Sequence, residues 1–252
     1  MFIFIFLFGI IIGSFLNVCI YRIPRGESIV YLSSHCPNCS TPLQWHDLIP
    51  ILSYILQGGK CKYCRKPISI QYPIVELLNG ILYLILYYKF SATINFAFYA
   101  IIFSVLIIIS FIDLHHQIIL DCLNIIIFIT SIIYKILRLG LYNTSPNIVN
   151  SLLGLIISAG IFLLISIVYN GGLGGGDIKL IGVLGFILGI KMILLNIFLS
   201  FILGAIISIF LLLFKIKGKK DPIPFGPFIC IAFMITIIFG ENIIVWYVSK
   251  FY

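Results

Sequence analysis

Residues 2–21 read FIFIFLFGIIIGSFLNVCIY, a run of twenty positions without a charged side chain. About 20 apolar residues in an α-helix span the hydrocarbon core of a bilayer, so this stretch predicts a membrane-spanning helix. It lacks the basic start and the small-residue cleavage site of a secretory signal peptide. We therefore expect the helix to be retained.

The composition of the whole chain extends this interpretation. Hydrophobic residues make up 62% and charged residues 10%, and the mean hydropathy is +1.20. Soluble domains carry roughly 25% charged residues, so this chain has too few charges to cover a water-facing surface. The lipid bilayer is the expected surrounding medium. The net charge of +8 would suggest nucleic acid for a soluble protein, but here the basic residues lie between apolar runs and no nucleic-acid partner is expected.

Seven further apolar runs predict an all-α membrane helix bundle with eight spans in total. These runs occupy residues 73–88, 95–112, 118–137, 148–169, 178–190, 192–214 and 223–248. The 178–190 run is short and rich in glycine, and Lys191 alone separates it from the next run.

The positions of Lys and Arg predict the orientation, because cytoplasmic loops are enriched in these residues. With the N-terminus placed outside, eleven basic residues fall in inside loops and five in outside loops. The inside residues are Arg22, Arg25, Lys60, Lys62, Arg65, Lys66, Lys179, Lys215, Lys217, Lys219 and Lys220, and the outside residues are Lys89, Lys135, Arg138, Lys191 and Lys250. An outside N-terminus is favoured, and eight spans return the C-terminus to the outside.

Residues 22–72 are more polar than the rest and form a predicted cytoplasmic insert between a first helix at 1–21 and a seven-helix membrane domain at 73–252. No internal repeat is apparent. The insert contains Cys36-Pro37-Asn38-Cys39 and Cys61-Lys62-Tyr63-Cys64. Two C-x-x-C turns at this separation are typical of one tetrahedral zinc ion, and four thiolates leave no open position for a catalytic water. The sequence therefore predicts a structural zinc site.

Two disulfides are the alternative for these cysteines, but cytoplasmic thiols stay reduced. His35 and His46 are nearby alternative ligands, although each is more simply a surface histidine. A small insert with few apolar residues cannot build its own core, so metal binding would supply its folding energy.

Two of the eight acidic residues lie at predicted span ends. Asp113 closes the third span in FIDLHH, and Asp177 precedes the sixth in GGGDIK. An ionisable residue at membrane depth is costly and indicates function. The topology derived from Lys and Arg places both acids on the cytoplasmic side. A carboxyl pair that shares one proton can hydrolyse a peptide bond, because the ionised member activates water while the protonated member polarises the carbonyl.

Glycines at 171, 172, 174, 175 and 176 remove side chains beside Asp177. A backbone without side chains can approach an extended substrate closely. Gly174, Gly176 and Lys179 are therefore candidate substrate contacts. Glu76, early in the second span, is a further buried acid that is a candidate for substrate or cofactor binding.

Structural roles for the same acids stay open at this point. Asp177 could cap its helix, since Asp is a favoured N-cap residue. Asp113 could pair with Lys179 or a histidine, and Asp121 competes for the place of the second carboxylate. A transporter with an aspartate proton relay is the alternative from another class, and it would require further deep ionisable residues and inverted repeats.

Five segments, taken in order, resemble those of the type IV prepilin peptidases. They are GSFLNVCIYRIPRGES at 13–28, the stretch from SHCPNC to VELLNG at 34–80, FIDLHHQIILD at 111–121, GGGDIKL at 174–180 and IPFGPF at 223–228. The G-x-G-D signature within GGGDIKL is weak alone, whereas the ordered set is specific.

The resemblance implies an aspartic endopeptidase with Asp113 and Asp177 as its catalytic pair and Cys36, Cys39, Cys61 and Cys64 as its cysteine tetrad. That family cleaves the short basic leader of prepilins or pseudopilins after a glycine, on the cytoplasmic face of the bacterial inner membrane. It then methylates the new N-terminal amine with S-adenosylmethionine. Prepilin substrates and pilus or secretion assembly machinery are the implied partners.

The complete cysteine loop resembles the bifunctional members rather than the shorter peptidase-only relatives, which remain the alternative. The insert has no G-x-G-x-x-G fingerprint. Methylation therefore rests on the resemblance alone, with Asn17, Arg22 and Glu76 as candidates for that chemistry or for substrate docking. The chain departs from the family at Leu120, where proline is usual.

Overall fold

The computed structural model describes residues 1–31, 34–142, 147–169, 173–215, 218 and 222–251. Gly171 and Gly172, which the sequence analysis places beside Asp177, lie outside these described residues. So do Lys217, Lys219 and Lys220, which it places in an inside loop. The described chain is helical, and no strand occurs in it. The predicted all-α class is confirmed for this part of the chain. Its contacts divide into two compact units, Met1–Ile108 and Ile109–Tyr252.

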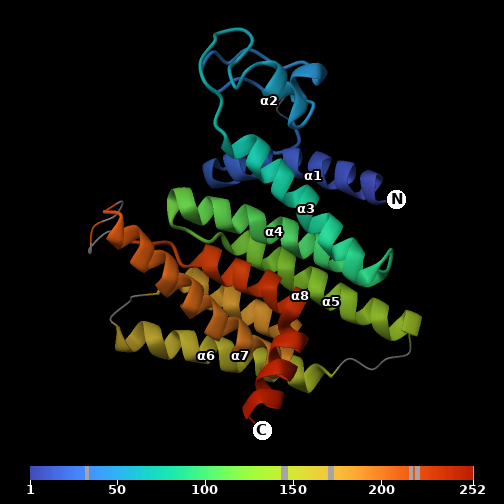
Figure 1. Ribbon diagram of the computed structural model, residues 1–252, viewed down its shortest axis with the longest axis vertical. Helices are drawn as coiled ribbons and strands as arrows, with labels where there is room; N and C mark the ends of the chain where they lie inside the picture. Colours follow the sequence, from blue (N-terminus) through green and yellow to red (C-terminus); the bar gives the residue numbers. More distant parts are fainter. Residues whose placement is uncertain (32–33, 143–146, 170–172, 216–217, 219–221, 252) are drawn as a thin grey trace. The chain divides into compact units, whose positions relative to one another are not determined.

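The first unit contains α1 (Phe2–Arg22), η1 (Ile23–Arg25), η2 (Trp45–Leu48), α2 (Leu52–Leu56), α3 (Gln71–Phe90) and the greater part of α4 (Ile94–His116) (Figure 1). Helices α1 and α3 touch through glycines spaced as in the small-xxx-small pattern of membrane helix pairs. A Cβ atom on Gly9 would lie 2.9 Å from the Gly80 Cα, and one on Gly13 would lie 2.7 Å from the Glu76 Cα. The Asn79 side chain donates to the Gly9 carbonyl at 2.6 Å. At this contact, Glu76 accepts a hydrogen bond from the Ile51 N–H of the cysteine-bearing insert at 2.8 Å.

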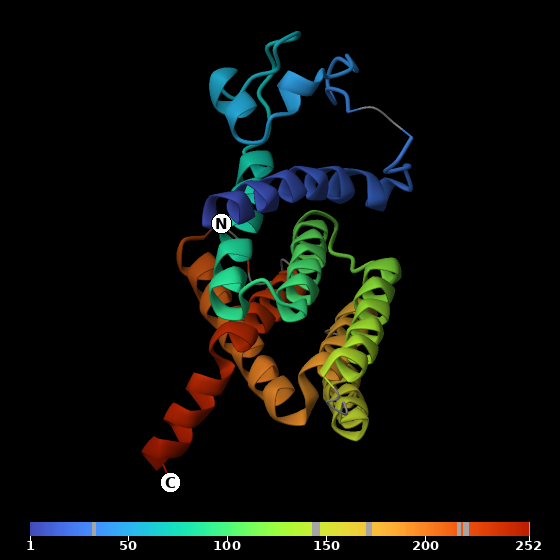
Figure 2. The same ribbon diagram turned by 90° about the vertical axis from the view of Figure 1, so that its right-hand side faces the viewer.

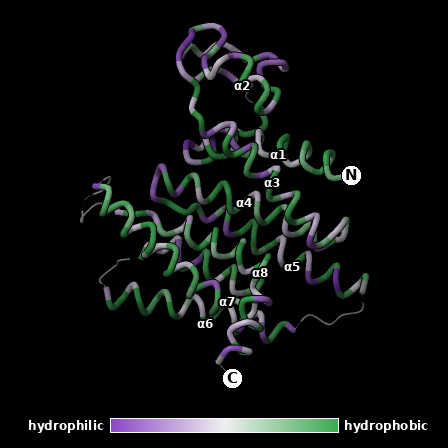
Figure 3. The backbone as a smooth tube through the Cα atoms, viewed as in Figure 1, coloured by the Kyte–Doolittle hydropathy of each residue, from purple (hydrophilic) through white to green (hydrophobic). Residues whose placement is uncertain are grey.

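The second unit contains the end of α4, followed by α5 (Asp121–Tyr142), α6 (Ile148–Val168), α7 (Gly175–Leu213) and α8 (Gly226–Phe251). Apolar side chains are widely exposed on these helices: Ile125 is 55% exposed, Ile129 50% and Ile133 50%. A water-soluble protein rarely exposes such a continuous apolar face. Figure 3 shows the same hydrophobic colouring along the long helices. The surface indicates contact with lipid.

Seven described helices are long and apolar enough to cross a membrane. The chain is therefore a multi-pass membrane protein, but the predicted number of eight spans is not matched. The predicted runs 178–190 and 192–214 form one element, the 39-residue α7. Its interruption is at Gly189 (φ 69, ψ 178) and not at Lys191. The charge of Lys191 suggests a boundary between the two runs in the sequence, whereas the backbone breaks at Gly189, because glycine tolerates a positive φ.

The break at Gly189 reverses the direction of α7 (Figure 2). A straight helix of this length would extend about 58 Å. However, Gly176 near its start and Gly226 at the start of α8 would both direct a Cβ atom onto Ile119, at 2.8 and 3.1 Å. Twelve or so residues between α7 and α8 can extend at most about 43 Å, too little to return along a straight helix. The first half of α7 therefore leads away from Ile119, and the second half leads back.

Packing on each side of Gly189 agrees with this path. The first half runs along α6, where the Ser158 hydroxyl donates to the Ile181 carbonyl at 3.0 Å. The second half runs antiparallel to α8, because Gly204 faces Phe228 and Gly240 faces Met192. At the break, the Asn150 side chain accepts a hydrogen bond from the Ile190 N–H at 3.2 Å. In effect, α7 is two helices that share one break.

Replacing Gly189 by Ala is expected to destabilise the protein by at least about 1–3 kcal/mol, because this combination of φ and ψ is essentially restricted to glycine. The added Cβ would also collide with the Asn150 side chain. Thermal unfolding of the detergent-solubilised protein should show a midpoint lower by roughly 2–10 °C. Gly160→Ala in α6 is the control, since a Cβ there meets nothing within 4 Å. An equal midpoint for both variants would contradict the assigned backbone at Gly189.

Candidate functional site

Asp113 lies in the last turn of α4, in the second unit. The helix stops because Gln117 adopts φ 55 and donates its N–H to the Asp113 carbonyl at 2.9 Å. This is the left-handed ending common at helix C-termini, here without glycine. The Asp113 side chain is 5% exposed. The helix end thus holds a carboxyl group in a buried position.

The Asp113 carboxylate is paired with the beginning of another helix. Its Oδ2 accepts a hydrogen bond from the Gly226 N–H at 3.0 Å. Gly226 is the first residue of α8, and the first N–H groups of a helix have no partner within the helix. They favour a negative charge nearby. A Cβ on Gly226 would lie 2.7 Å from Oδ2, so only glycine permits this approach.

Asp177 is the third residue of α7, whose N-cap is Gly174. A backbone hydrogen bond from Gly174 reaches its carboxyl group, as at the third position of a capping box. Asp177 therefore does help to cap its helix, as the alternative proposed, but it does so from the third helical position, because the N-cap residue is Gly174. The side chain is 9% exposed, and Oδ1 has no hydrogen-bond partner in the described part of the chain. One carboxyl oxygen is thus left for a ligand or a water molecule.

The two aspartates meet around Ile119. This residue, between α4 and α5, contacts Gly176 of α7 and Gly226 of α8. Asp113 and Asp177 lie close enough to interact electrostatically. The buried thiol of Cys230 is within electrostatic reach of both. The second unit therefore brings together the two acids that the sequence analysis selected, although they are far apart in the chain.

The other predicted residues of this region have different surroundings. Lys179 donates to both oxygens of Asp121 at 2.8 Å. Their side chains are 57% and 60% exposed, so this ion pair contributes at most about 1 kcal/mol. Asp121 is thus engaged on the surface, and Lys179 does not pair with Asp113. Gly175 faces open space, whereas the missing side chain of Gly176 makes room for Ile119.

Asn124 is a polar residue that the sequence analysis missed. It is 4% exposed, and neither its amide nitrogen nor its amide oxygen has a hydrogen-bond partner among the described residues. It lines a cavity of about 330 Å³ together with Asp121, Phe128 and Lys179. An amide in the first turn of α5, directly before the apolar stretch 125–129, was the available signal. Its free donor and acceptor match the N–H and C=O of a peptide group.

The cysteine insert contains the second group of predicted residues. The sulfur atoms of Cys36, Cys39, Cys61 and Cys64 all lie within 4.8 Å of one another. Four thiolates at about 2.3 Å from a tetrahedral zinc would be about 3.8 Å apart. The Cys36 and Cys64 sulfur atoms are 3.9 Å apart, and all four cysteines are free thiols, so the disulfide alternative is not observed. The geometry fits a metal ion, and neither His35 nor His46 joins the cluster.

The two C-x-x-C turns are structural repeats of each other. Cys36 N–H donates to the Thr41 carbonyl at 3.0 Å, and Cys61 N–H donates to the Lys66 carbonyl at 2.8 Å. Ser40 and Arg65, which follow the turns, adopt φ 55 and φ 60. The two C-x-x-C motifs seen in the sequence thus share one backbone conformation. Few positions besides the cysteines match, because the repeat is defined by backbone hydrogen bonds.

The four thiols cannot all ionise easily without a cation. Hydrogen bonds with Thr41 lower the pKa of Cys39 to about 6. The pKa of Cys64 is raised to about 11, because desolvation and the neighbouring thiols outweigh the backbone hydrogen bond from Lys66 that lowers it. A divalent ion would compensate the charge of four thiolates.

Glu76 lies in the first unit, where it is 6% exposed. It accepts hydrogen bonds from the Ile51 N–H at 2.8 Å and from the Ser14 hydroxyl. Asn17 and Arg22 are buried in the same unit, at 3% and 4% exposure. These three candidates for methylation or docking therefore belong to one region of α1 and α3.

Comparisons with known proteins cover nearly the whole chain. The family described as "Bacterial Peptidase A24 N-terminal domain" matches residues 7–90, and the "Type IV leader peptidase family" matches residues 100–209. A protein of Bacillus subtilis named "Prepilin leader peptidase/N-methyltransferase" is 35% identical over 246 residues, covering 97% of each chain. Proteins with the same name from Legionella pneumophila and Aeromonas hydrophila are 33% and 29% identical, over 96% and 98% of this chain and 93% of each relative. No solved structure matches the chain.

These matches confirm the predicted family and, with it, the prediction of an enzyme. They extend through the cysteine insert and through both aspartate-bearing segments. With relatives of this identity aligned from end to end, the chain belongs to the type IV leader peptidase family.

Proposed function

We propose that this protein is an aspartic endopeptidase of the cell membrane that removes the leader of prepilins or pseudopilins after a glycine and then N-methylates the new N-terminal residue. The observation that carries the proposal is the meeting of Asp113 and Asp177 at helix ends around Ile119. Both acids are buried in a chain of the leader peptidase family.

In the proposed cleavage step, the two carboxyl groups share one proton. Asp113 accepts a hydrogen bond from the Gly226 N–H at the start of α8. Because a helix N-terminus favours a negative charge, Asp113 is the ionised member. It removes a proton from water, whose oxygen attacks the scissile carbonyl carbon. Asp177, with its unpartnered Oδ1, carries the shared proton and donates it to the carbonyl oxygen. As the tetrahedral intermediate collapses, Asp113 gives its proton to the departing amine. Asp177 takes back a proton from one hydroxyl group of the intermediate, which becomes the new carboxyl group, so the pair again holds one proton.

Substrate binding next to this pair requires that the cleaved segment be extended. Gly175 leaves open space at the start of α7, and Gly174 has no side chain where the Asp177 carboxylate lies. Asn124 offers a free donor and acceptor for one peptide group. Gly176 supports the site by packing on Ile119. Lys179 and Asp121, paired with each other, lie at the exposed edge of the Asn124 cavity.

The orientation is part of the same proposal. The excess of Lys and Arg in alternate loops supports an outside N-terminus and a site on the cytoplasmic side of the bacterial membrane. Because α7 reverses at Gly189, it can cross the membrane twice. The start of α8 then lies on the same side of the membrane as the start of α7. The division into a first helix at 1–21, an insert at 22–72 and a membrane domain at 73–252 belongs to this topology.

Co-expression with a prepilin, followed by the intact mass of the pilin, tests both activities together. The expected product has lost its leader after a glycine and gained one methyl group. A product that is cleaved but unmethylated would leave a peptidase without methyltransferase activity. An unprocessed prepilin in the presence of folded, membrane-inserted enzyme would contradict the proposal. Pilus and secretion assembly proteins would be the later partners of the processed pilin.

The cysteine cluster is proposed to hold one structural zinc ion through Cys36, Cys39, Cys61 and Cys64. Elemental analysis of the purified protein is expected to find about one zinc per chain. Cys61→Ser should lower the zinc content by at least about tenfold, since three thiolates bind more weakly than four. Cys122→Ser is the control, because Cys122 is exposed on α5 outside the cluster. Equal zinc content in both variants, or none in the unaltered protein, would contradict the site.

A further inference from the structure

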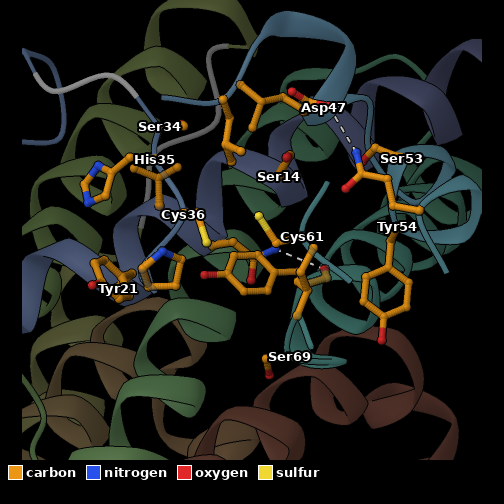
Figure 4. Close-up of a pocket in the computed structure, with 18 of the residues that line it drawn as sticks. Ser14, Tyr21, Ser34, His35, Cys36, Asp47, Ser53, Tyr54, Cys61 and Ser69 are labelled. Atoms are coloured by element: carbon orange, nitrogen blue, oxygen red, sulfur yellow. Dashed lines mark hydrogen bonds between the residues drawn. The ribbon is translucent and has the colours of Figure 1, made fainter. Parts of the chain in front are cut away.

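A cavity of about 470 Å³ lies within the first unit, between α1, α3 and the cysteine insert. This volume is within the range of small-molecule binding sites. Figure 4 shows lining side chains from α1 and the insert, among them Ser14, Cys36, Tyr54 and Cys61. Tyr72 and Glu76 of α3 also line the cavity. None of the residues that line it comes from the unit that holds the two aspartates.

Two buried polar groups in the cavity lining lack the partners that their burial calls for. Glu76 receives hydrogen bonds from Ile51 and Ser14, but no basic side chain is among its described electrostatic partners. The Asn17 side-chain amide donates a hydrogen bond to the Tyr72 carbonyl at 3.0 Å, while its Oδ1 has no hydrogen-bond partner in the described chain. A buried carboxylate and a buried acceptor both call for a donor or a cation.

We propose that this cavity binds the methyl donor, S-adenosylmethionine, and that Glu76 and Asn17 recognise its positively charged part. The inference rests on the methyltransferase half of the proposed function. A sulfonium and an ammonium group would compensate the charge of Glu76 and supply a donor to the Asn17 Oδ1. The guanidinium of the buried Arg22, which also lines the cavity, matches the carboxylate of the same molecule. The aromatic rings of Tyr54 and Tyr72 suit an adenine base.

The methyl transfer itself needs no further reactant. The lone pair of the new N-terminal amine attacks the methyl carbon, and the carbon–sulfur bond breaks with its electron pair remaining on sulfur. The sulfonium becomes a neutral thioether, and the positive charge passes to the amine, which then loses a proton to water. The loss of the sulfonium charge leaves only the ammonium group to compensate Glu76, so the spent donor is held more weakly than the donor itself.

The cysteine cluster contributes to this arrangement, because Cys36 and Cys61 form part of the cavity wall together with Pro37 and Pro67. The insert has few apolar residues of its own, so the metal would keep this wall in place. This accounts for a cysteine loop placed next to a cavity rather than elsewhere on the chain.

The test fills the cavity and measures donor binding directly. Ser53 on α2 lines the cavity and is half-buried, and its hydroxyl makes no hydrogen bond within the described part of the chain, so Ser53→Trp would add bulk inside the cavity. Leu56→Trp on the same helix is the matched control, since Leu56 is 85% exposed and does not line the cavity. Glu76→Gln removes the charge and retains an acceptor for the Ile51 N–H. Equilibrium dialysis of full-length protein in detergent with methyl-tritiated S-adenosylmethionine gives the affinity, and prepilin cleavage by the same preparations reports folding.

Ser53→Trp and Glu76→Gln are expected to weaken donor binding by at least about tenfold, while Leu56→Trp binds as the unaltered protein does. Donor affinity in Ser53→Trp equal to that of the unaltered protein would overturn the assignment. So would a raised KM for prepilin with unchanged donor affinity, which would assign the cavity to the peptide. If the unaltered protein cleaves prepilin but neither binds the donor nor methylates, the methyltransferase half of the proposed function has failed, and the peptidase half stands.

Discussion

Replacing Asp177 by Asn is expected to lower the rate of leader cleavage by at least about a thousandfold, with the protein still folded and inserted. The amide has nearly the same shape and can still accept the backbone hydrogen bond from Gly174. It cannot hold the proton that the two carboxyl groups share, so no general acid is left to protonate the carbonyl oxygen of the scissile bond. Single-turnover cleavage of a purified prepilin in detergent measures the loss.

Asp121→Asn is the matched control for this substitution. Asp121 is also an acid at a helix start in the second unit, but it is 60% exposed and paired with Lys179. Its replacement is expected to change the cleavage rate by less than about threefold, because exposed ion pairs contribute little. A large loss with Asp121→Asn and a small one with Asp177→Asn would show that the second carboxylate has been misassigned.

Gly226→Ala is expected to lower cleavage by roughly a hundredfold, although it adds a single methyl group. That methyl would lie 2.7 Å from the Asp113 Oδ2, so either the carboxylate or the start of α8 must move. The hydrogen bond from the Gly226 N–H, at 3.0 Å, would be lost or lengthened. A displacement of about 1 Å at a reacting group can cost about a hundredfold in rate.

The same prepilin assay with Gly140→Ala provides the comparison. Gly140 lies near the end of α5, and a Cβ there meets nothing within 4 Å. Alanine is also the better helix former, so neither folding nor cleavage should suffer. If Gly226→Ala cleaved as fast as Gly140→Ala, the contact between α8 and Asp113 would have no part in catalysis.

Residue chemistry was sufficient to predict the class of fold, the sulfur cluster and two acids that the structure brings together. Long uncharged runs predicted membrane helices, and two C-x-x-C turns predicted the sulfur cluster that the structure contains. Asp113 and Asp177 were selected because acids are rare in such a chain, and the structure brings them together. Each of these features is visible in a short segment.

The features that were missed depend on contacts between distant segments. The reversal of α7 at Gly189 is hidden because the runs on both sides are apolar on every face, so no periodicity marks the turn. The motif IPFGPF was recognised, but nothing in its letters indicates that the Gly226 N–H meets Asp113. Asn124 became a candidate only when its buried amide was found without a partner.

The most direct test of the central claim, that Asp113 and Asp177 act as one unit, is a double-mutant cycle on single-turnover cleavage with Asp113→Asn, Asp177→Asn and the two combined. Groups that act together are strongly non-additive, so the combined variant is expected to be no slower than the slower single variant, within about threefold. Losses that multiply in the combined variant, or a single variant that cleaves at nearly the unaltered rate, would contradict a shared catalytic pair.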